Sequence, residues 1–323
     1  MSRKVLVVSH GGRPEAVRAA EQAVHALRAA GLEPVLDEEV ADVAGLEMVV
    51  VLGGDGTILR AAELTHGTGV PLLGVNLGHV GFLAESEREQ IDEAVRRIAT
   101  GEYDVEERGT VETRVLSPGG DVVTGWALNE ATVEKADRAR MVEVVIEVDG
   151  RPLSSFGCDG VVMSTSTGST AHAFSAGGPV VWPDVDAMLL VPVSAHALFA
   201  RPLVVGPRSV LAVEILARSP SPAVLTCDGR RQVDLPPGAR VEVRRSDVPV
   251  RLARLSHAPF TDRLVSRFAL PVTGWRGRAP NGTAERAADD AAAAEATAAA
   301  EATEVAAAVA VERGPRAVAE DAG

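Results

Sequence analysis

The first hundred residues alternate short apolar runs with helical patterns. Val5–Val8 is an all-apolar run typical of a buried parallel strand, and similar runs predict strands at about 32–36, 48–52 and 70–75. Pro14 opens a helical pattern that Gly31 ends. The apolar face of this helix consists of Val17, Ala20, Val24 and Leu27. A second helix is predicted after a capping box of Ser86 and Glu89. Residues 1–108 are therefore predicted to form a three-layer α/β domain around a parallel sheet.

From about residue 109 the apolar pattern changes to period two. Asp149-Gly150 and Asp228-Gly229 are hairpin-turn dipeptides between apolar runs, so we interpret Asp228 as a turn residue. The pattern predicts an all-β, sandwich-like domain over 109–254. A helical pattern after Pro259 predicts that the segment 255–280 returns to the first domain.

The last segment, 281–323, is a low-complexity tail. Residues 284–323 hold 19 alanines, nine acidic residues and three arginines, which gives −6 of the net charge of −13. Alanine favours helix, but this stretch has few larger apolar residues to bury. We expect a solvated appendage.

Composition excludes several classes of protein. A net charge of −13 argues against a nucleic-acid-binding surface. No apolar run reaches the roughly 18 residues of a membrane-spanning helix, and the start of the chain lacks a signal peptide, so we expect a cytoplasmic protein. The two cysteines do not make a disulfide framework or a metal cluster. Lys4 and Lys135 are the only lysines, which leaves few candidates for a phosphate-binding lysine.

The sequence Gly53-Gly54-Asp55-Gly56-Thr57 follows an apolar strand and precedes a helix. Such a turn lies at the carboxyl edge of a parallel sheet, where free backbone N–H groups at the helix start attract anions. The pattern is not a Walker loop, because no lysine follows. We expect backbone N–H groups to hold phosphates and Asp55 to act on a hydroxyl proton or a metal ion. The alternative is a tight turn in which Asp55 caps the helix.

Two further motifs end predicted strands. Gly74–Leu83 reads GVNLGHVGFL, where Phe82 is either a base-stacking ring or a core residue. Ala127-Leu128-Asn129-Glu130 offers an amide for a base edge and a carboxylate for ribose hydroxyls, although a solvated strand end is the alternative.

A hydroxyl-rich loop follows the strand that begins near Val161. Six of the seven residues 164–170 are Ser or Thr, which suit ribose, base edges and phosphate. The flanking strand and Gly177-Gly178-Pro179 argue against a flexible linker.

Together these motifs resemble the NAD kinase family, in order and spacing, over about residues 4–278. The matching stretches are GGDGT (53–57), GVNLGHVGFL (74–83), ALNE (127–130) and CDGVVMSTSTGSTAHAFSAGGP (158–179). The resemblance implies an α/β domain followed by a β-sandwich-like domain with the site between them. It also implies transfer of the terminal phosphoryl group of ATP, or of polyphosphate, to the 2′-hydroxyl of the adenosine ribose of NAD. A divalent cation, expected to be Mg²⁺, and a homo-oligomer, a dimer or a tetramer, are implied as well.

The resemblance also assigns roles to individual residues. Asp55 would be the catalytic carboxylate, and the phosphate loop would consist of Gly53, Gly54, Gly56 and Thr57. The expected NAD-binding residues are Phe82, Asn129, Glu130, Asp159, Thr167, Thr170, Ala171 and His172. Among these, Glu130 would bind ribose and Asp159 would face the nicotinamide end, while the metal ligands stay open.

Ser166 and His172 depart from the family pattern STPTGSTAY, which has proline and tyrosine there. Serine frees a loop that proline would fix, and His172 is smaller than tyrosine, which predicts weaker NAD binding. Two alternatives to NAD kinase activity are a non-catalytic NAD or NADP sensor and a lipid kinase of the diacylglycerol kinase type. The lipid kinases share only the Gly-Asp-Gly loop, and no basic membrane-binding surface is evident here.

Overall fold

The computed structural model describes residues 3–9, 12–37, 43–78, 81–256 and 258–272. Met1–Phe260 is one compact unit and Thr261–Gly323 is a second. The predicted tail, 281–323, lies outside the described residues. In the described part of the chain, no helix is long and apolar enough to cross a membrane.

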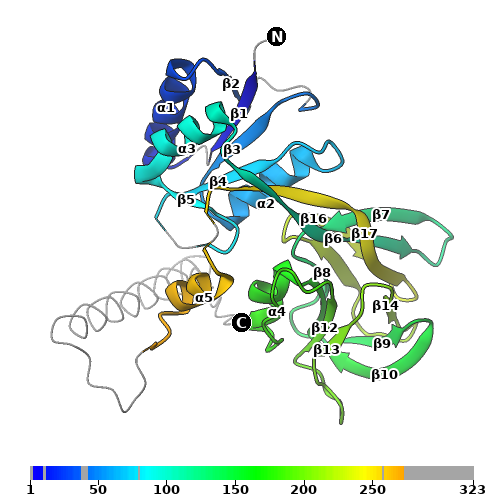
Figure 1. Cartoon of the computed structure of the whole chain (residues 1–323). Coiled ribbons are helices and arrows are strands. Elements are labelled where there is room, and N and C mark those ends of the chain that lie inside the picture. Colours follow the sequence, from blue (N-terminus) through cyan, green and yellow to red (C-terminus); the bar gives the residue numbers. More distant parts are fainter. Residues whose placement is uncertain (1–2, 10–11, 38–42, 79–80, 257, 273–323) are drawn as a thin grey trace, which may run out of the picture. The chain divides into compact units, whose positions relative to one another are not determined.

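The N-terminal domain is a parallel sheet between helices (Figure 1). Its elements are β1 (Lys4–Ser9), α1 (Pro14–Ala29), β2 (Glu33–Leu36), β3 (Met48–Leu52), α2 (Asp55–Thr65), β4 (Leu72–Asn76), β5 (Ser86–Glu87) and α3 (Ile91–Thr100). The order is β4-β3-β1-β2, with β5 beside β4, and all these pairs are parallel. Residues of α1 and α3 share one apolar core on the sheet, whereas those of α2 share another. The predicted three-layer architecture is confirmed.

The buried face of α1 differs from the predicted one. Ala16, Ala19, Ala23 and Leu27 are the buried residues, whereas Val17 is exposed. Ala20 and Val24 lie at the margin of the core. The prediction favoured the larger apolar side chains, but small alanines let a helix lie closer to a sheet.

The capping box before α3 is also shifted by one residue. Glu87 and Gln90 form it, around the 3₁₀ turn η2 (Arg88–Gln90). Ser86 instead belongs to β5, so its predicted role as the cap is wrong.

The second domain is a β-sandwich, as predicted. Its elements are β6 (Asp104–Leu116), β7 (Val122–Ala127), β8 (Glu130–Lys135), β9 (Val142–Val148), β10 (Arg151–Cys158), β11 (Gly160–Thr165), η3 (Thr167–Thr170), α4 (His172–Ser175), β12 (Met188–Val193), β13 (Leu203–Val205), β14 (Val210–Ile215), β15 (Ala223–Cys227), β16 (Arg231–Leu235) and β17 (Arg240–Arg254). One sheet is antiparallel, in the order β13-β12-β11-β8-β15-β16. Its apolar side chains share a core with those of β6, β7, β9, β14 and β17. Both predicted Asp-Gly turns are present, with positive φ at each residue.

The sheet of the first domain continues into the sandwich, which the sequence did not indicate. The 15-residue strand β17 pairs with β6 along its length and reaches β4 through Leu252 opposite Leu72. One 11-stranded sheet thus spans both domains. The chain therefore already re-enters the first domain on β17. The return of the segment 255–280 stays a prediction, while the expected helix is α5 (Phe260–Phe268).

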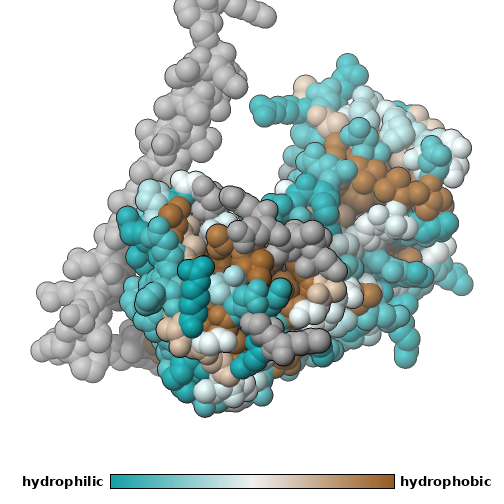
Figure 2. Space-filling view, turned by 90° about the horizontal axis from the view of Figure 1, so that it is seen from above, coloured by the Kyte–Doolittle hydropathy of each residue, from teal (hydrophilic) through white to brown (hydrophobic). Residues whose placement is uncertain are grey.

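The surface seen in Figure 2 mixes hydrophobic patches with hydrophilic residues. Large exposed apolar side chains are found on several strands and loops of the described chain, including Val122 on β7 and Leu153 on β10. Such scattered exposure is ordinary for a folded protein.

Candidate active site

Asp55 lies in the first turn of α2 and does not cap it. The N-cap residue is Gly54, and no side chain caps this helix. The Asp55 carboxylate instead accepts hydrogen bonds from the backbone N–H groups of Phe82 (3.0 Å) and Leu83 (3.1 Å). The interpretation of Asp55 as an N-cap is therefore wrong. These bonds fix the orientation of a half-exposed carboxylate at the carboxyl edge of the sheet.

The loop that binds Asp55 requires a glycine. A Cβ atom at Gly81 would lie 2.3 Å from Asp55 Oδ1. Beside it, Phe82 is only 8% exposed, and its ring centroid is 6.0 Å from that of Phe260. The GGDGT and GVNLGHVGFL motifs thus form one structure, and protein already covers most of the Phe82 side chain. His79 and Val80 lie outside the described residues.

Two glycines of the first motif are not required by the fold. Gly54 has an ordinary φ of −84°, and a Cβ atom at Gly54 or Gly56 would meet nothing within 4 Å. Both residues are exposed at the start of α2. At Gly53, by contrast, a Cβ atom would lie 2.5 Å from Thr57 Oγ1. Close packing against Thr57 therefore requires a glycine at position 53, whereas the space above Gly54 and Gly56 is open.

A second cluster joins the ALNE motif to the hydroxyl-rich loop. Thr165 donates its backbone N–H to the Asn129 carbonyl (2.9 Å) and its hydroxyl to the Leu128 carbonyl (2.6 Å). A Cβ atom at Gly168 would lie 2.1 Å from the same Asn129 carbonyl oxygen. Asn129 connects β7 to β8, so the predicted solvated strand end is wrong, and its residues are buried.

Several hydroxyls of this loop serve the protein itself. Ser164 donates to the Asn129 carbonyl (3.0 Å), Ser166 to the carbonyls of Val185 and Ala187, and Ser169 to that of Val181 (3.1 Å). These buried bonds exclude a flexible linker. The half-buried Thr170 and Ala171, with the buried Thr167, are the remaining predicted contacts in this loop.

Glu130 begins β8 next to this loop, and its carboxyl group accepts a hydrogen bond from the backbone N–H of His172. Burial first, and then the nearby Asp228, raise the pKa of Glu130 to about 8. A carboxyl group that keeps its proton near neutral pH can donate as well as accept a hydrogen bond. His172 itself is half-buried at the start of α4.

Asp159 lies apart from Glu130. Its carboxylate pairs with Lys135 Nζ at 2.6 Å, and this lysine holds the pKa of Asp159 below its usual range. Lys135 ends β8 and Glu130 begins it. Five residues of strand correspond to about 17 Å, so Asp159 and Glu130 could contact only opposite parts of an elongated ligand.

The two clusters meet through Leu128. Its fully buried side chain belongs to the same apolar core as Ile58 and Leu59 of α2. The residue before Asn129 therefore shares an apolar core with the helix that Asp55 begins. This shared core brings the phosphate-loop candidates and the NAD-binding candidates of the second domain to one region, with Asp159 at its far side.

Asp228 is a residue of this region that sequence reasoning missed. It does form the predicted turn, with φ of 52°. Its side chain, however, is buried and accepts N–H hydrogen bonds from Leu128 (3.0 Å) and Asn129 (2.7 Å). Burial raises the pKa of Asp228, and these donors counteract that effect. An Asp-Gly dipeptide predicts a turn but does not indicate which groups the aspartate carboxylate contacts.

A glycine-lined strand-to-helix loop can bind an anionic group, and an oriented carboxylate beside it can position an acceptor, which is the arrangement that a phosphotransferase requires. Two family models match the chain: the ATP-NAD kinase N-terminal domain over residues 13–103 and the ATP-NAD kinase C-terminal domain over residues 128–255. The chain belongs to the NAD kinase family.

Curated relatives and solved structures agree with this family. NAD kinase 2 of Streptomyces coelicolor is 59% identical and NAD kinase of Leifsonia xyli subsp. xyli is 61% identical, each over 85% of this chain and 97% of the relative. The crystal structure of an Archaeoglobus fulgidus NAD kinase in complex with ATP is 27% identical, with a TM-score of 0.66 over 84% of this chain and all of that one. Yeast NADH kinase complexed with NADH shares the fold, with a TM-score of 0.77 at 19% identity over 86% of this chain and 90% of that one.

Proposed function

We propose that this protein transfers the terminal phosphoryl group of ATP to the 2′-hydroxyl of the adenosine ribose of NAD, giving NADP. One observation carries the proposal. Three motifs that lie far apart in the sequence converge through Asp55, Leu83 and Leu128, in a chain that belongs to the NAD kinase family. Family membership also argues against the lipid kinase alternative.

Asp55 is the residue proposed to orient the 2′-hydroxyl and take its proton. The N–H groups of Phe82 and Leu83 hold both carboxylate oxygens before any substrate binds. Each oxygen keeps a further acceptor position for the ribose hydroxyl. Phosphoryl transfer depends mainly on in-line positioning and on neutralised charge, so a prearranged carboxylate favours it.

The phosphate loop is proposed to bind through the backbone N–H groups of Gly54 and Gly56 at the start of α2, with Gly53 and Thr57 lining it. The N–H groups of Gly53 and Thr57 are already donated to the carbonyls of Val75 (3.0 Å) and Gly54 (2.9 Å). The open space above Gly54 and Gly56 supports this role, because the fold itself does not exclude a methyl group there. Gly54→Ala should therefore unfold like the wild type while its KM for ATP rises at least tenfold. If Gly54→Ala kept the wild-type KM for ATP, the loop would not be part of the phosphate site.

The residues present fit a Mg²⁺ ion that arrives on the phosphates. Among the described residues, no group of three or more His, Cys, Asp or Glu side chains could hold a metal ion. Mg²⁺ keeps several waters and typically binds through substrate phosphates and one or two carboxylates, a role open to Asp55. When bound, it would neutralise charge on the phosphate oxygens. Parallel assays with ATP and with polyphosphate would identify the donor.

The NAD-binding contacts are proposed to lie along β8 and the loop after β11. Asn129, Thr167, Thr170 and Ala171 would contact adenine near Phe82, and Glu130 would bind ribose beside His172. Asp159, which pairs with Lys135 at the other end of β8, would face the nicotinamide part of the dinucleotide. Both described lysines are already paired with carboxylates, Lys135 with Asp159 and Lys4 with Glu33.

A cytoplasmic homo-oligomer, a dimer or a tetramer, is proposed as the assembled form. The segment between α4 and β13 exposes Trp182, Val185, Leu198 and Phe199, with Leu198 fully exposed. Exposed large apolar side chains on one segment support an interface between copies. Light scattering coupled to size-exclusion chromatography would give the number of subunits.

The test of the proposed function is direct. The protein is incubated with NAD, ATP and magnesium, and NADP is measured with an NADP-specific dehydrogenase. We expect NADP to accumulate with time and enzyme concentration. A protein that binds NAD but forms no NADP would be a sensor rather than a kinase.

A further inference from the structure

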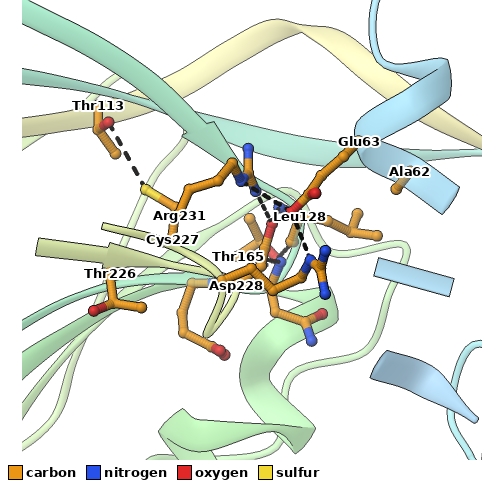
Figure 3. A network of polar contacts seen from close by, with 12 residues as sticks. Ala62, Glu63, Thr113, Leu128, Thr165, Thr226, Cys227, Asp228 and Arg231 are labelled. Atoms are coloured by element: carbon orange, nitrogen blue, oxygen red, sulfur yellow. Dashed lines mark hydrogen bonds and ion pairs between the residues drawn. The ribbon is translucent and has the colours of Figure 1, made fainter. Parts of the chain in front are cut away.

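A polar network joins helix α2 to the turn between β15 and β16 (Figure 3). Glu63, on α2, pairs with Arg230 Nε at 2.9 Å and with Arg231 Nε at 3.2 Å. Arg231 Nη2 in turn donates to Asp228 Oδ2 at 2.6 Å. Glu63 lies eight positions after Asp55 on the same helix, about 12 Å along its axis. The network thus begins on the helix that carries the catalytic carboxylate.

The other end of the network holds the backbone of residues 128–130. Asp228 Oδ2 accepts the N–H of Leu128, and Oδ1 accepts those of Asn129 at 2.7 Å and Glu130 at 3.4 Å. Its own N–H donates to the Glu130 carbonyl at 2.9 Å. The turn at Asp228-Gly229 needs only positive φ at these two residues, which Asn or Gly supplies equally well. The turn therefore does not account for the buried carboxylate of Asp228, whereas its contacts with 128–130 do.

Ring stacking also joins α2 to the second domain. The Arg231 guanidinium carbon lies 4.3 Å from the centroid of the Trp126 ring. The Trp126 ring in turn stacks on His66, with centroids 3.7 Å apart and planes 5° from parallel. His66 is the C-cap residue of α2. Helix α2 is therefore held at Glu63 and at its C-terminal end by groups of the second domain.

We propose that Asp228 and Arg231, with Glu63, are positioning residues of the kinase site. This inference rests on the proposed function. Asp228 holds the backbone that presents Asn129 and Glu130 to the nucleoside, and Arg231 links that backbone to α2, which presents Asp55. The network sets the distance between the bound 2′-hydroxyl and the carboxylate that acts on it. A misplacement of about 1 Å at a reacting group can cost on the order of 100-fold in rate.

The proposal predicts different kinetic effects at the two ends of the network. Glu63→Gln keeps the size of a partly exposed side chain and leaves every Asp228 contact in place. It should lower kcat by roughly 3- to 30-fold while the KM for NAD changes less than twofold. Asp228→Asn keeps a turn-compatible residue but weakens the hold on 128–130, so it should raise the KM for NAD about tenfold. A role in stability alone would not separate the two constants in this way.

A matched control is available on α3. Glu93 is an exposed glutamate that pairs with Arg96 at 2.7 Å, away from the site. Glu93→Gln makes the same chemical change and should leave both kcat and KM at wild-type values. A double-mutant cycle of Glu63→Gln with Arg231→Gln completes the design, since the double variant should be no slower than the slower single variant.

Several outcomes would overturn the proposal. Glu63→Gln could behave like Glu93→Gln, or the effects of Glu63→Gln and Arg231→Gln on kcat could multiply independently. NADP formation by the wild type tests the proposed function separately. If the wild type bound NAD without forming NADP, calorimetry would still decide: Asp228→Asn should weaken NAD binding about tenfold, and an unchanged Kd would refute the positioning role.

Discussion

Replacement of Asp55 by asparagine is the perturbation that the structure makes most specific. Both carboxylate oxygens accept backbone N–H groups, at 3.0 Å from Phe82 and 3.1 Å from Leu83. Asparagine has one acceptor oxygen, so one of these N–H groups would face an NH₂ group. A lost hydrogen bond to a charged group costs about 1.5–3 kcal/mol, which sets the expected loss in the free energy of unfolding. The variant should still fold, since the buried apolar core around α2 is unchanged.

The effect of Asp55→Asn on catalysis should exceed its effect on stability. A positioned general base contributes roughly 10²–10⁴ in rate, or about 2.7–5.5 kcal/mol of barrier. We expect kcat to fall by that factor in the NADP assay, while calorimetry shows NAD still bound. Asp92→Asn, in the first turn of α3, is the matched control for a helix-start carboxylate. A folded Asp55→Asn variant with near wild-type kcat would refute the role of Asp55 as the base.

Three further substitutions test the site. Because burial raises the pKa of Glu130 to about 8, the folded state binds more protons than the unfolded state between about pH 4.5 and 8, and stability falls as pH rises through that window. The difference in the free energy of unfolding between pH 6 and pH 9, measured by urea denaturation, should therefore be smaller by a few kcal/mol in Glu130→Gln than in the wild type. An equal difference in the two proteins would contradict the raised pKa of Glu130. Ser166 has φ of −59°, which proline adopts. Ser166→Pro should change the free energy of unfolding by less than about 1 kcal/mol, because the loss of the serine hydroxyl bonds offsets the gain from a stiffer unfolded chain. A loss above about 2 kcal/mol would be inconsistent with this geometry. His172→Tyr should lower the KM for NAD, and an unchanged KM would show that this position does not limit NAD binding.

The parts of the fold that depend on local pattern could be predicted from the sequence. The apolar run before Gly53 and the glycines around Asp55 indicated a strand, a turn and a helix, and β3 and α2 have those positions. The turns at Asp149 and Asp228 follow from their dipeptides in the same way. These signals act within a few residues, so no tertiary contact overrides them.

Features that depend on distant partners could not be predicted. The buried face of α1 is determined by how closely its alanines approach the sheet, which hydrophobicity alone does not indicate. The pairing of β17 with β4 joins residues 180 positions apart, Leu72 and Leu252. Asp228 acquires its contacts with Leu128 and Asn129 only when β15 lies beside β8. A single sequence contains both residues of such a pair but does not show that they lie close together in the fold.

The position of the transferred phosphate tests the proposed reaction most directly. The purified protein is incubated with NAD, ATP and magnesium, and the product is examined by phosphorus NMR and mass spectrometry. We expect one added phosphoryl group, on the 2′-hydroxyl of the adenosine ribose, formed at a rate that falls at least 100-fold in Asp55→Asn. A product phosphorylated elsewhere, or NAD recovered unchanged, would contradict the proposed reaction.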